Sequence, residues 1–242
     1  MVTIDQLIPV LKRLRLSGVM HTLDLREEQA REDSQQHREF MYRLLCDEIE
    51  RRDSKNIATR VKQAGFPGQK VLEEFEFTFN PEIPKARIID LATCQFIRRA
   101  ENVLLIGPSG VGKSHIGLAL GHRACRAGFR VLYRTADVLL AELRAAEADR
   151  SRDRLLTRLS NHDLLIIDDL GLTPLKGEEP INLYELIRAR YEKSATIITS
   201  NRDIPEWAGL FRDPLLASAA IDRLLHHAHV ITLTGKSYRT QR

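Results

Sequence analysis

Residues 107–114 combine the residue types and the spacing that bind the phosphates of a nucleotide. They match the P-loop pattern G-x-x-x-x-G-K-[ST] and are Gly107, Pro108, Ser109, Gly110, Val111, Gly112, Lys113 and Ser114. The glycines let backbone N–H groups converge on phosphate oxygens. We expect Lys113 to reach the β- and γ-phosphates, the Ser114 hydroxyl to bind Mg²⁺ and His115 to complete the nucleotide-binding segment.

The flanking sequence gives this motif the structural setting that it needs. Residues 102–106 form a short apolar run that is typical of a buried strand, and residues 115–127 have helical spacing with Gly128 as a stop. A strand, a glycine loop and a helix would place the helix N-terminus, with its partial positive charge, at the phosphates. These flanks disfavour the alternative of a glycine-rich turn that matches by chance, so the sequence predicts a nucleoside triphosphate site.

A second apolar run, residues 164–167, ends in Asp168 and Asp169. At the carboxyl end of a strand beside the P-loop, Asp168 would hold Mg²⁺ through its water shell. Asp169 would then orient and polarise the attacking water. A surface turn is the alternative, because Asp before Leu-Gly is common in turns.

Two further residues are candidates for the hydrolytic step. Asn201 closes the tripeptide Thr199-Ser200-Asn201 after another apolar run, where an amide can hydrogen-bond the γ-phosphate or the water. Arg223 could complete the site of a neighbouring subunit and stabilise the transferred phosphoryl group. The alternatives are a capping or turn role for Asn201 and a surface ion pair for Arg223.

Three histidines near the end of the chain do not predict a metal site. Adjacent histidines on a helix point to different faces, and no cysteine or carboxylate cluster completes a ligand set. These residues are His226, His227 and His229.

The composition is that of an ordinary globular protein with a mildly basic charge. The 242 residues carry a net charge of +4, which permits a polyanionic partner without demanding one. No apolar run reaches membrane-spanning length, and the start lacks a signal-peptide pattern. The three cysteines are far apart and in no metal-ligand spacing, so we expect reduced thiols and a cytoplasmic location.

The order of predicted elements indicates an α/β fold with a parallel five-stranded sheet and helices on each side. Strands are expected at residues 102–106, 130–135, 163–168, 195–199 and 229–233, with helices at 115–127, 137–146 and 181–192. Residues 1–66 read as a small helical domain for DNA, partner or oligomer contacts. Residues 67–100, with their prolines and phenylalanines, read as a connector, and residues 101–242 as the nucleotide-binding domain.

Several motifs taken together resemble the IstB-like ATPases. These are AAA+ helper proteins of insertion-sequence transposition and are related to DnaC-type helicase loaders. The resemblance covers nearly the whole chain and is weakest over the first 35 or so residues. It is carried by residues 60–66, 107–114, 168–171, 199–201, 205–207, 222–228 and 235–239.

The resemblance implies an AAA+ ATPase core that uses ATP and Mg²⁺, self-assembles on duplex DNA and assists a cognate transposase. It implies that Lys113 contacts the phosphates and that Ser114 and Asp168 bind Mg²⁺. It also implies that Asp169 orients the attacking water and that Asn201 senses the γ-phosphate. Arg223 matches the arginine that crosses between subunits. No C-terminal helical lid is expected, and Arg239 is a weak candidate for contact with nucleotide or DNA.

The sequence gives weaker evidence for DNA contact than for ATP binding. Basic residues cluster at 12–15 and 51–62, as phosphate-backbone binding requires, but acidic residues among them fit a solvated helix face equally well. No base-reading motif is present, so binding should be largely independent of DNA sequence.

Three other functions remain alternatives. A replicative helicase loader shares the core but should favour single-stranded DNA. A small-molecule kinase shares the P-loop but needs an acceptor pocket and a closing lid. A nucleotide-switched DNA-binding module would hydrolyse negligibly.

Overall fold

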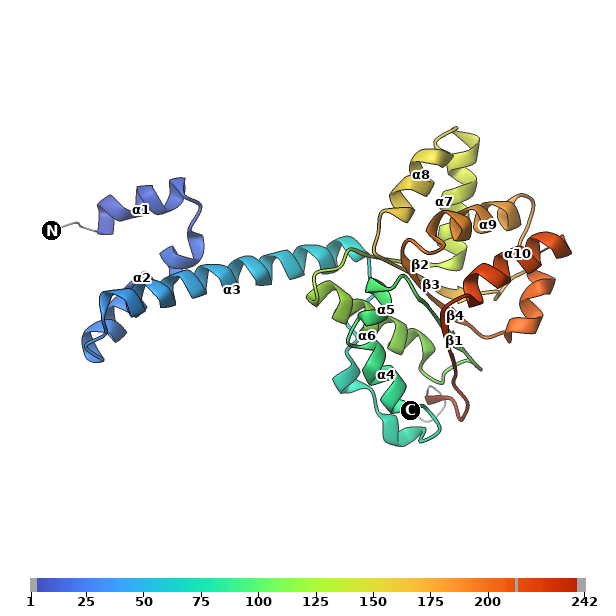
Figure 1. Ribbon diagram of the computed structural model, residues 1–242, viewed down its shortest axis with the longest axis horizontal. Coiled ribbons are helices and arrows are strands. Elements are labelled where there is room, and N and C mark those ends of the chain that lie inside the picture. Colours follow the sequence, from blue (N-terminus) through green and yellow to red (C-terminus); the bar gives the residue numbers. More distant parts are fainter. Residues whose placement is uncertain (1–3, 212, 239–242) are drawn as a thin grey trace. The chain divides into compact units, whose positions relative to one another are not determined.

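The computed structural model describes residues 4–211 and 213–238. The chain divides into two compact units, Met1–Thr59 and Arg60–Arg242. Figure 1 labels most of their helices and strands along the chain. Arg239, the weak candidate for nucleotide or DNA contact, lies outside the described residues.

The N-terminal unit is helical, as the sequence predicts. It contains α1 (Ile4–Arg13), α2 (Ser17–Glu32) and most of α3 (His37–Ala64). The C-terminal end of α3 is followed by Gly65 with φ of 72°, a left-handed conformation that glycine adopts without strain. The small core of this unit consists of Leu11, Val19, Leu23 and Leu44.

A buried carboxylate joins α3 to the beginning of α2. Glu48 accepts hydrogen bonds from the backbone N–H groups of Gly18 and Val19, which have no partner within their own helix. Arg52 donates to the other carboxylate oxygen at 2.6 Å. Burial opposes ionisation, but these donors hold the pKa of Glu48 below its ordinary value. The carboxylate therefore serves as the N-terminal cap that α2 lacks in its own sequence.

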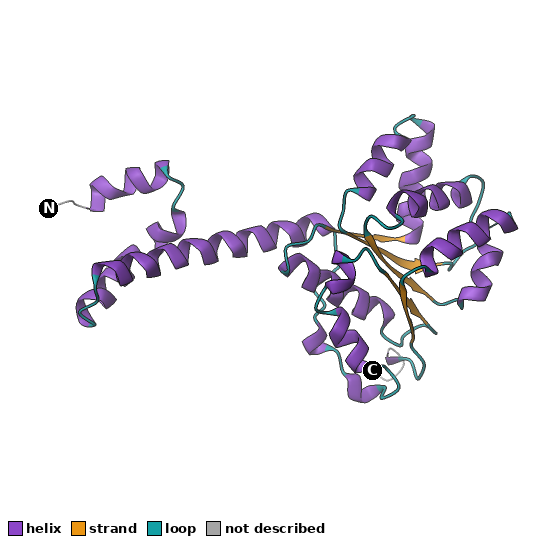
Figure 2. Ribbon diagram, in the orientation of Figure 1, coloured by secondary structure: helices purple, strands orange, loops and turns teal. Residues whose placement is uncertain are grey.

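The second unit is built on a parallel five-stranded sheet in the order β2-β3-β4-β1-β5, which confirms the predicted fold class. Figure 2 shows the strands enclosed by helices. The strands are β1 (Asn102–Ile106), β2 (Val131–Thr135), β3 (Leu164–Leu170), β4 (Ala195–Ser200) and β5 (Ala228–Thr232).

Alternate residues of the central strands enter two separate cores, one on each face of the sheet. In β1, Val103 and Leu105 belong to one core, while Leu104 and Ile106 belong to the other. The first face is covered by α4 (Lys85–Leu91), α5 (Gln95–Arg98) and α6 (Lys113–Arg126). The second is covered by α7 (Ala136–Ala148), α8 (Arg152–Ser160), α9 (Glu179–Arg190) and α10 (Pro214–Leu225).

The segment that precedes α4 is irregular and packs onto the first core. It contains two short 3₁₀ helices, η1 (Leu72–Glu74) and η2 (Phe77–Phe79). Phe75 and Phe77 meet edge to face with ring centroids 4.7 Å apart and lie against the core that α6 covers. A third 3₁₀ helix, η3 (Ile204–Leu210), buries Trp207 against the opposite core.

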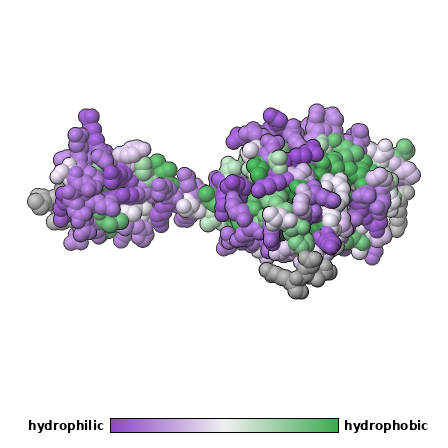
Figure 3. All heavy atoms as spheres, turned by 90° about the horizontal axis from the view of Figure 1, so that it is seen from below, coloured by the Kyte–Doolittle hydropathy of each residue, from purple (hydrophilic) through white to green (hydrophobic). Residues whose placement is uncertain are grey.

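Hydrophilic side chains cover most of the surface drawn in Figure 3, with apolar areas between them on the larger unit. Among the helices of residues 4–211 and 213–238, none combines the length and the apolar character needed to cross a bilayer.

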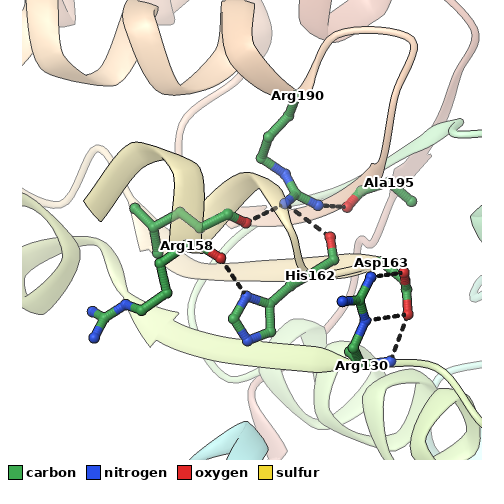
Figure 4. A network of polar contacts seen from close by, with 7 residues as sticks. Arg130, Arg158, His162, Asp163, Arg190 and Ala195 are labelled. Carbon is green, nitrogen blue, oxygen red and sulfur yellow. Dashed lines mark hydrogen bonds and ion pairs between the residues drawn. The ribbon is translucent and has the colours of Figure 1, made fainter. Parts of the chain in front are cut away.

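Hydrogen bonds from a buried arginine connect the elements at the edge of the sheet where β3 and β4 begin. Arg190, 3% exposed, donates to the carbonyl oxygens of Leu159 at 2.6 Å, His162 at 3.1 Å and Ala195 (Figure 4). Burial lowers the pKa of Arg190 to about 9, which leaves the guanidinium charged at neutral pH. Because a buried charge is tolerated only when its donors are satisfied, these carbonyls fix the ends of α8, α9 and β4 together.

The substitution Arg190→Met should lower the free energy of unfolding by about 3 kcal/mol, because it leaves several buried carbonyl groups without a donor. Urea denaturation measures this loss. Arg188→Met is the matched control on the same helix, since Arg188 is exposed and forms an ion pair with Glu185 at the surface. It should change stability by less than about 0.5 kcal/mol. Equal losses in the two variants would contradict the structural role of Arg190.

Candidate functional site

The P-loop connects the end of β1 to the beginning of α6 and needs glycine at three positions. Gly107, Gly110 and Gly112 have φ values of 145°, 83° and 103°. A Cβ atom on Gly107 would lie 1.9 Å from the carbonyl oxygen of Leu233, so no side chain fits there. The loop therefore has the backbone conformation that presents N–H groups to an anion at the start of a helix.

The first two residues of α6 point their polar atoms into the interior. Lys113 is buried, and its Nζ atom donates to the carbonyl oxygen of Pro108 at 2.7 Å. The Oγ atom of Ser114 donates to Oδ1 of Asp168 at 2.8 Å. This hydrogen bond joins the two predicted motifs, the P-loop and the pair of aspartates near the end of β3.

Asp168 is a buried carboxylate that accepts hydrogen bonds from three hydroxyl groups. Besides Ser114, the hydroxyl of Thr199 on β4 donates to Oδ1 and that of Tyr133 on β2 donates to Oδ2 at 2.8 Å. Burial and the adjacent carboxylate raise the pKa of Tyr133, which keeps it a proton donor. A carboxylate beside a serine hydroxyl is an oxygen ligand set that suits Mg²⁺, so the residues present fit this ion.

Asp169 follows in a left-handed conformation with φ of 59°, which aspartate tolerates better than most residues. Its backbone N–H group donates to Oγ1 of Thr199 at 2.9 Å. The same threonine hydroxyl therefore fixes both aspartates. The register of β3 against β4 shifts between Ile167 and Leu170, so the two consecutive aspartates lie at an irregularity of the strand.

A pocket of about 750 Å³ collects most of the predicted site residues. This volume lies within the range of small-molecule sites. It is lined by residues 109–115 of the P-loop and α6, by Asp169 and by Asn201, which follows β4. Further lining residues come from the connector and the C-terminal segment and include Lys70, Glu74, Phe75, Glu76, Phe79 and Tyr238.

Arg223 lies away from this pocket, near the opposite edge of the sheet. It lines a separate cavity of about 250 Å³ together with Asn102 and Thr196, where β1 and β4 begin. The P-loop follows the other end of β1, roughly 15 Å along a strand of this length. Arg223 donates to the Ala219 carbonyl at 2.8 Å, and its guanidinium lies 5.4 Å from the ring centroid of Tyr184.

The expectation that no carboxylate completes a histidine set near the chain end is wrong. Ligand atoms of Glu192, His226 and His227 all lie within 4.8 Å of one another, and all three residues are exposed. Helix α10 ends at Leu225, and His227 has φ of 57°, so the two histidines do not follow helical directions. His229 lies apart from this group and pairs with Glu101 at 2.8 Å.

Some of the basic residues considered as candidates for DNA contact contribute to the fold of the N-terminal unit. Arg51 donates to Ser17, and Arg52 donates to Glu48 and, at 3.1 Å, to the Arg15 carbonyl. Exposed basic residues of the two groups include Lys12, Arg13 and Lys55.

Sequence reasoning missed Thr199 and Tyr133 as parts of the site. Thr199 belongs to the tripeptide from which Asn201 was chosen, so the sequence pattern was found but the role was given to Asn201 alone. No sequence signal identified Tyr133, because its contact depends on the register of β2 against β3, which pairs Thr135 with Asp168.

Comparison with known proteins identifies the family. The family model described as "IstB-like ATP binding protein" matches residues 9–242. The chain belongs to this family. A relative from Pseudomonas aeruginosa, "Insertion sequence IS21 putative ATP-binding protein", is 40% identical over 230 residues, which cover 95% of this chain and 87% of the relative.

Two solved structures are similar in fold to much of this chain. A crystal structure of DnaI has a TM-score of 0.59 at 20% identity and covers 69% of this chain and 92% of its own. A crystal structure of the DnaC helicase loader has a TM-score of 0.51 at 21% identity and covers 65% and 94%. Together with the IstB-like family match, the fold makes this protein an AAA+ ATPase that binds ATP.

The substitution Thr199→Val should raise the Mg²⁺ concentration needed for half-maximal ATP turnover, because it removes the hydroxyl that fixes Asp168 and Asp169. It should also lower the free energy of unfolding by about 1–3 kcal/mol. A Mg²⁺ titration of turnover and urea denaturation measure the two effects. Thr196→Val is the control at the other end of β4, where the hydroxyl meets Arg190 at 3.2 Å. That variant should lose stability without a change in Mg²⁺ requirement, and the same Mg²⁺ shift in both variants would contradict the assignment.

Proposed function

We propose that this IstB-like protein is an ATP-driven helper of DNA transposition, which oligomerises on duplex DNA and assists a separate transposase. The site at the P-loop supports ATP hydrolysis. The insertion-sequence name of the relative described above supports the link to transposition. The convergence of Ser114, Thr199 and Asp168 beside a pocket of nucleotide size is the observation that carries the ATPase part.

The positions of the site residues support the following roles. Lys113 exchanges the Pro108 carbonyl for oxygens of the β- and γ-phosphates, while the loop N–H groups bind the same phosphates. Ser114 and Asp168 would hold Mg²⁺, and the bound ion would neutralise part of the phosphate charge. Asp169 accepts a hydrogen bond from the attacking water and orients it, and Asn201 donates to the γ-phosphate or the water.

The position of Arg223 supports the proposal that each ATPase site is shared between two subunits. It lines a cavity separate from the P-loop pocket of its own chain, which supports a contact with the nucleotide of another copy. There it would stabilise the charge of the transferred phosphoryl group. The competing interpretation is a structural role, in which Arg223 stacks on Tyr184 of its own chain. Only the catalytic role requires a second subunit.

ATP turnover that rises with protein concentration and is stimulated by long duplex DNA is the expected result for the wild-type protein. Arg223→Ala should lower the stimulated rate by about 10²-fold or more. Arg188→Ala, which removes an exposed arginine of α9, is the control and should retain the rate. Stimulation by single-stranded DNA alone would instead favour a helicase loader, and turnover indifferent to DNA, concentration and Arg223 would reject the proposal.

Mixing two inactive variants tests the sharing of sites directly. Lys113→Ala retains the arginine, and Arg223→Ala retains the P-loop. In an equimolar random oligomer about one quarter of the interfaces combine both intact groups, so activity should return to about that fraction. Failure of the mixture to regain activity, with each variant folded, would place Arg223 outside the neighbouring site.

We also propose that residues 1–66 form a domain that contacts DNA or partners, joined by residues 67–100 to the ATPase domain. Replacing Lys12, Arg13 and Lys55 with alanine should weaken duplex binding and reduce the steepness of its salt dependence by about 2–3 in the logarithmic slope. Arg43→Ala, which removes a charge already paired with Glu39, should change the slope little. Fluorescence anisotropy over a salt series measures both; an unchanged slope in the triple variant would remove these residues from the interface.

A further inference from the structure

The segment that follows β5 lies directly on the P-loop. The backbone N–H of Leu233 donates to the carbonyl of Ile106 at 2.7 Å, and that of Tyr238 donates to the carbonyl of Gly110 at 3.0 Å. A Cβ atom on Gly110 would lie 2.1 Å from the Oγ atom of Ser237. Residues 234–238, called the C-terminal strap below, are therefore in van der Waals contact with the phosphate-binding loop.

The strap is also attached to the connector. The side-chain amide of Asn80 donates to the carbonyl of Thr234, whose hydroxyl donates to Glu82. Gly235 adopts φ of 111°, and a Cβ atom there would lie 2.4 Å from Nδ2 of Asn80. These contacts, which join residues some 150 positions apart in the sequence, hold the strap in one place beside the pocket.

The strap ends in an aromatic side chain at the pocket wall. The ring of Tyr238 meets that of Phe79 edge to face with centroids 5.0 Å apart, and its hydroxyl donates to Glu76 at 3.3 Å. Although it has these neighbours, Tyr238 is 43% exposed, and it lines the same pocket as the P-loop. A large, partly apolar surface is thus available to a ligand at the end of the pocket formed by the connector and the strap.

We infer that Tyr238 and Phe79 form the binding surface for the purine base of the nucleotide, an inference that rests on the nucleotide site proposed above. The N-terminus of α6 fixes where the phosphates bind, so the base must extend into the remainder of the pocket. That remainder is bounded by aromatic rings from the connector and the strap. Stacking on an aromatic ring favours any base but favours purines most, because of their larger π-face.

The binding of two ligands separates this role from a general effect on the site. ATP carries a base, and inorganic tripolyphosphate offers the phosphates alone. Tyr238→Ala should weaken ATP binding about 10-fold while the affinity for tripolyphosphate changes less than about 2-fold. Tyr238→Phe retains the ring and should bind ATP within about 3-fold of the wild-type protein. Tyr42→Ala, which removes an exposed tyrosine of the N-terminal unit, is the matched control and should change neither affinity.

Three results would overturn the inference. Equal weakening of ATP and tripolyphosphate in Tyr238→Ala would mean that the strap supports the P-loop and not the base. Unchanged ATP binding in this variant, or a loss as large in Tyr238→Phe, would remove ring stacking as the cause. Lys113→Ala tests the proposed phosphate site itself, because it should weaken the binding of both ATP and tripolyphosphate. If the affinity for neither ligand falls, the phosphates do not bind at the P-loop, and the proposed nucleotide site is wrong. Isothermal titration calorimetry of the full chain provides all of these affinities.

Discussion

The candidate site depends on the hydrogen bonds that converge on Asp168. Its carboxylate accepts from hydroxyl groups on α6, β4 and β2, so one side chain on β3 connects the P-loop helix with both neighbouring strands. A buried carboxylate without such donors would carry a large desolvation cost. With these donors, the carboxylate is held in place before nucleotide binds. The Thr199 hydroxyl also accepts a hydrogen bond from the backbone N–H of Asp169, which positions the second aspartate.

The sheet gives the ATPase unit two functionally different edges. At the carboxyl ends of β1, β3 and β4 lie the groups suited to phosphate, metal and water. At the opposite edge, Arg190 fixes the loops through backbone carbonyls, and Arg223 stacks on tyrosine rings. Hence the edge that carries Arg223 can be presented to another copy without disturbing the P-loop of its own chain. A parallel sheet permits this division because all strands point the same way.

The sequence predicted the sheet and the P-loop well, because short apolar runs and a motif with fixed spacing are local signals. The predicted strand at residues 102–106 has the bounds of β1, and the others differ by one or two residues. Helices α8 and α10 were not assigned. The contacts of Tyr133, Tyr238 and Glu192 could not be predicted, since each depends on strand register, on the path after β5 or on the turn that ends α10.

The strand order has a consequence for how this protein is made on the ribosome. Strand β1, which leads into the P-loop, lies between β4 and β5, and both of these follow it late in the chain. While the polypeptide is being synthesised, the apolar β1 has no strand partner until β4 has emerged, and Gly107 meets Leu233 only after β5. The nucleotide site therefore cannot be complete until β5 has been synthesised, and the apolar β1 needs protection from aggregation until its partner strands are available.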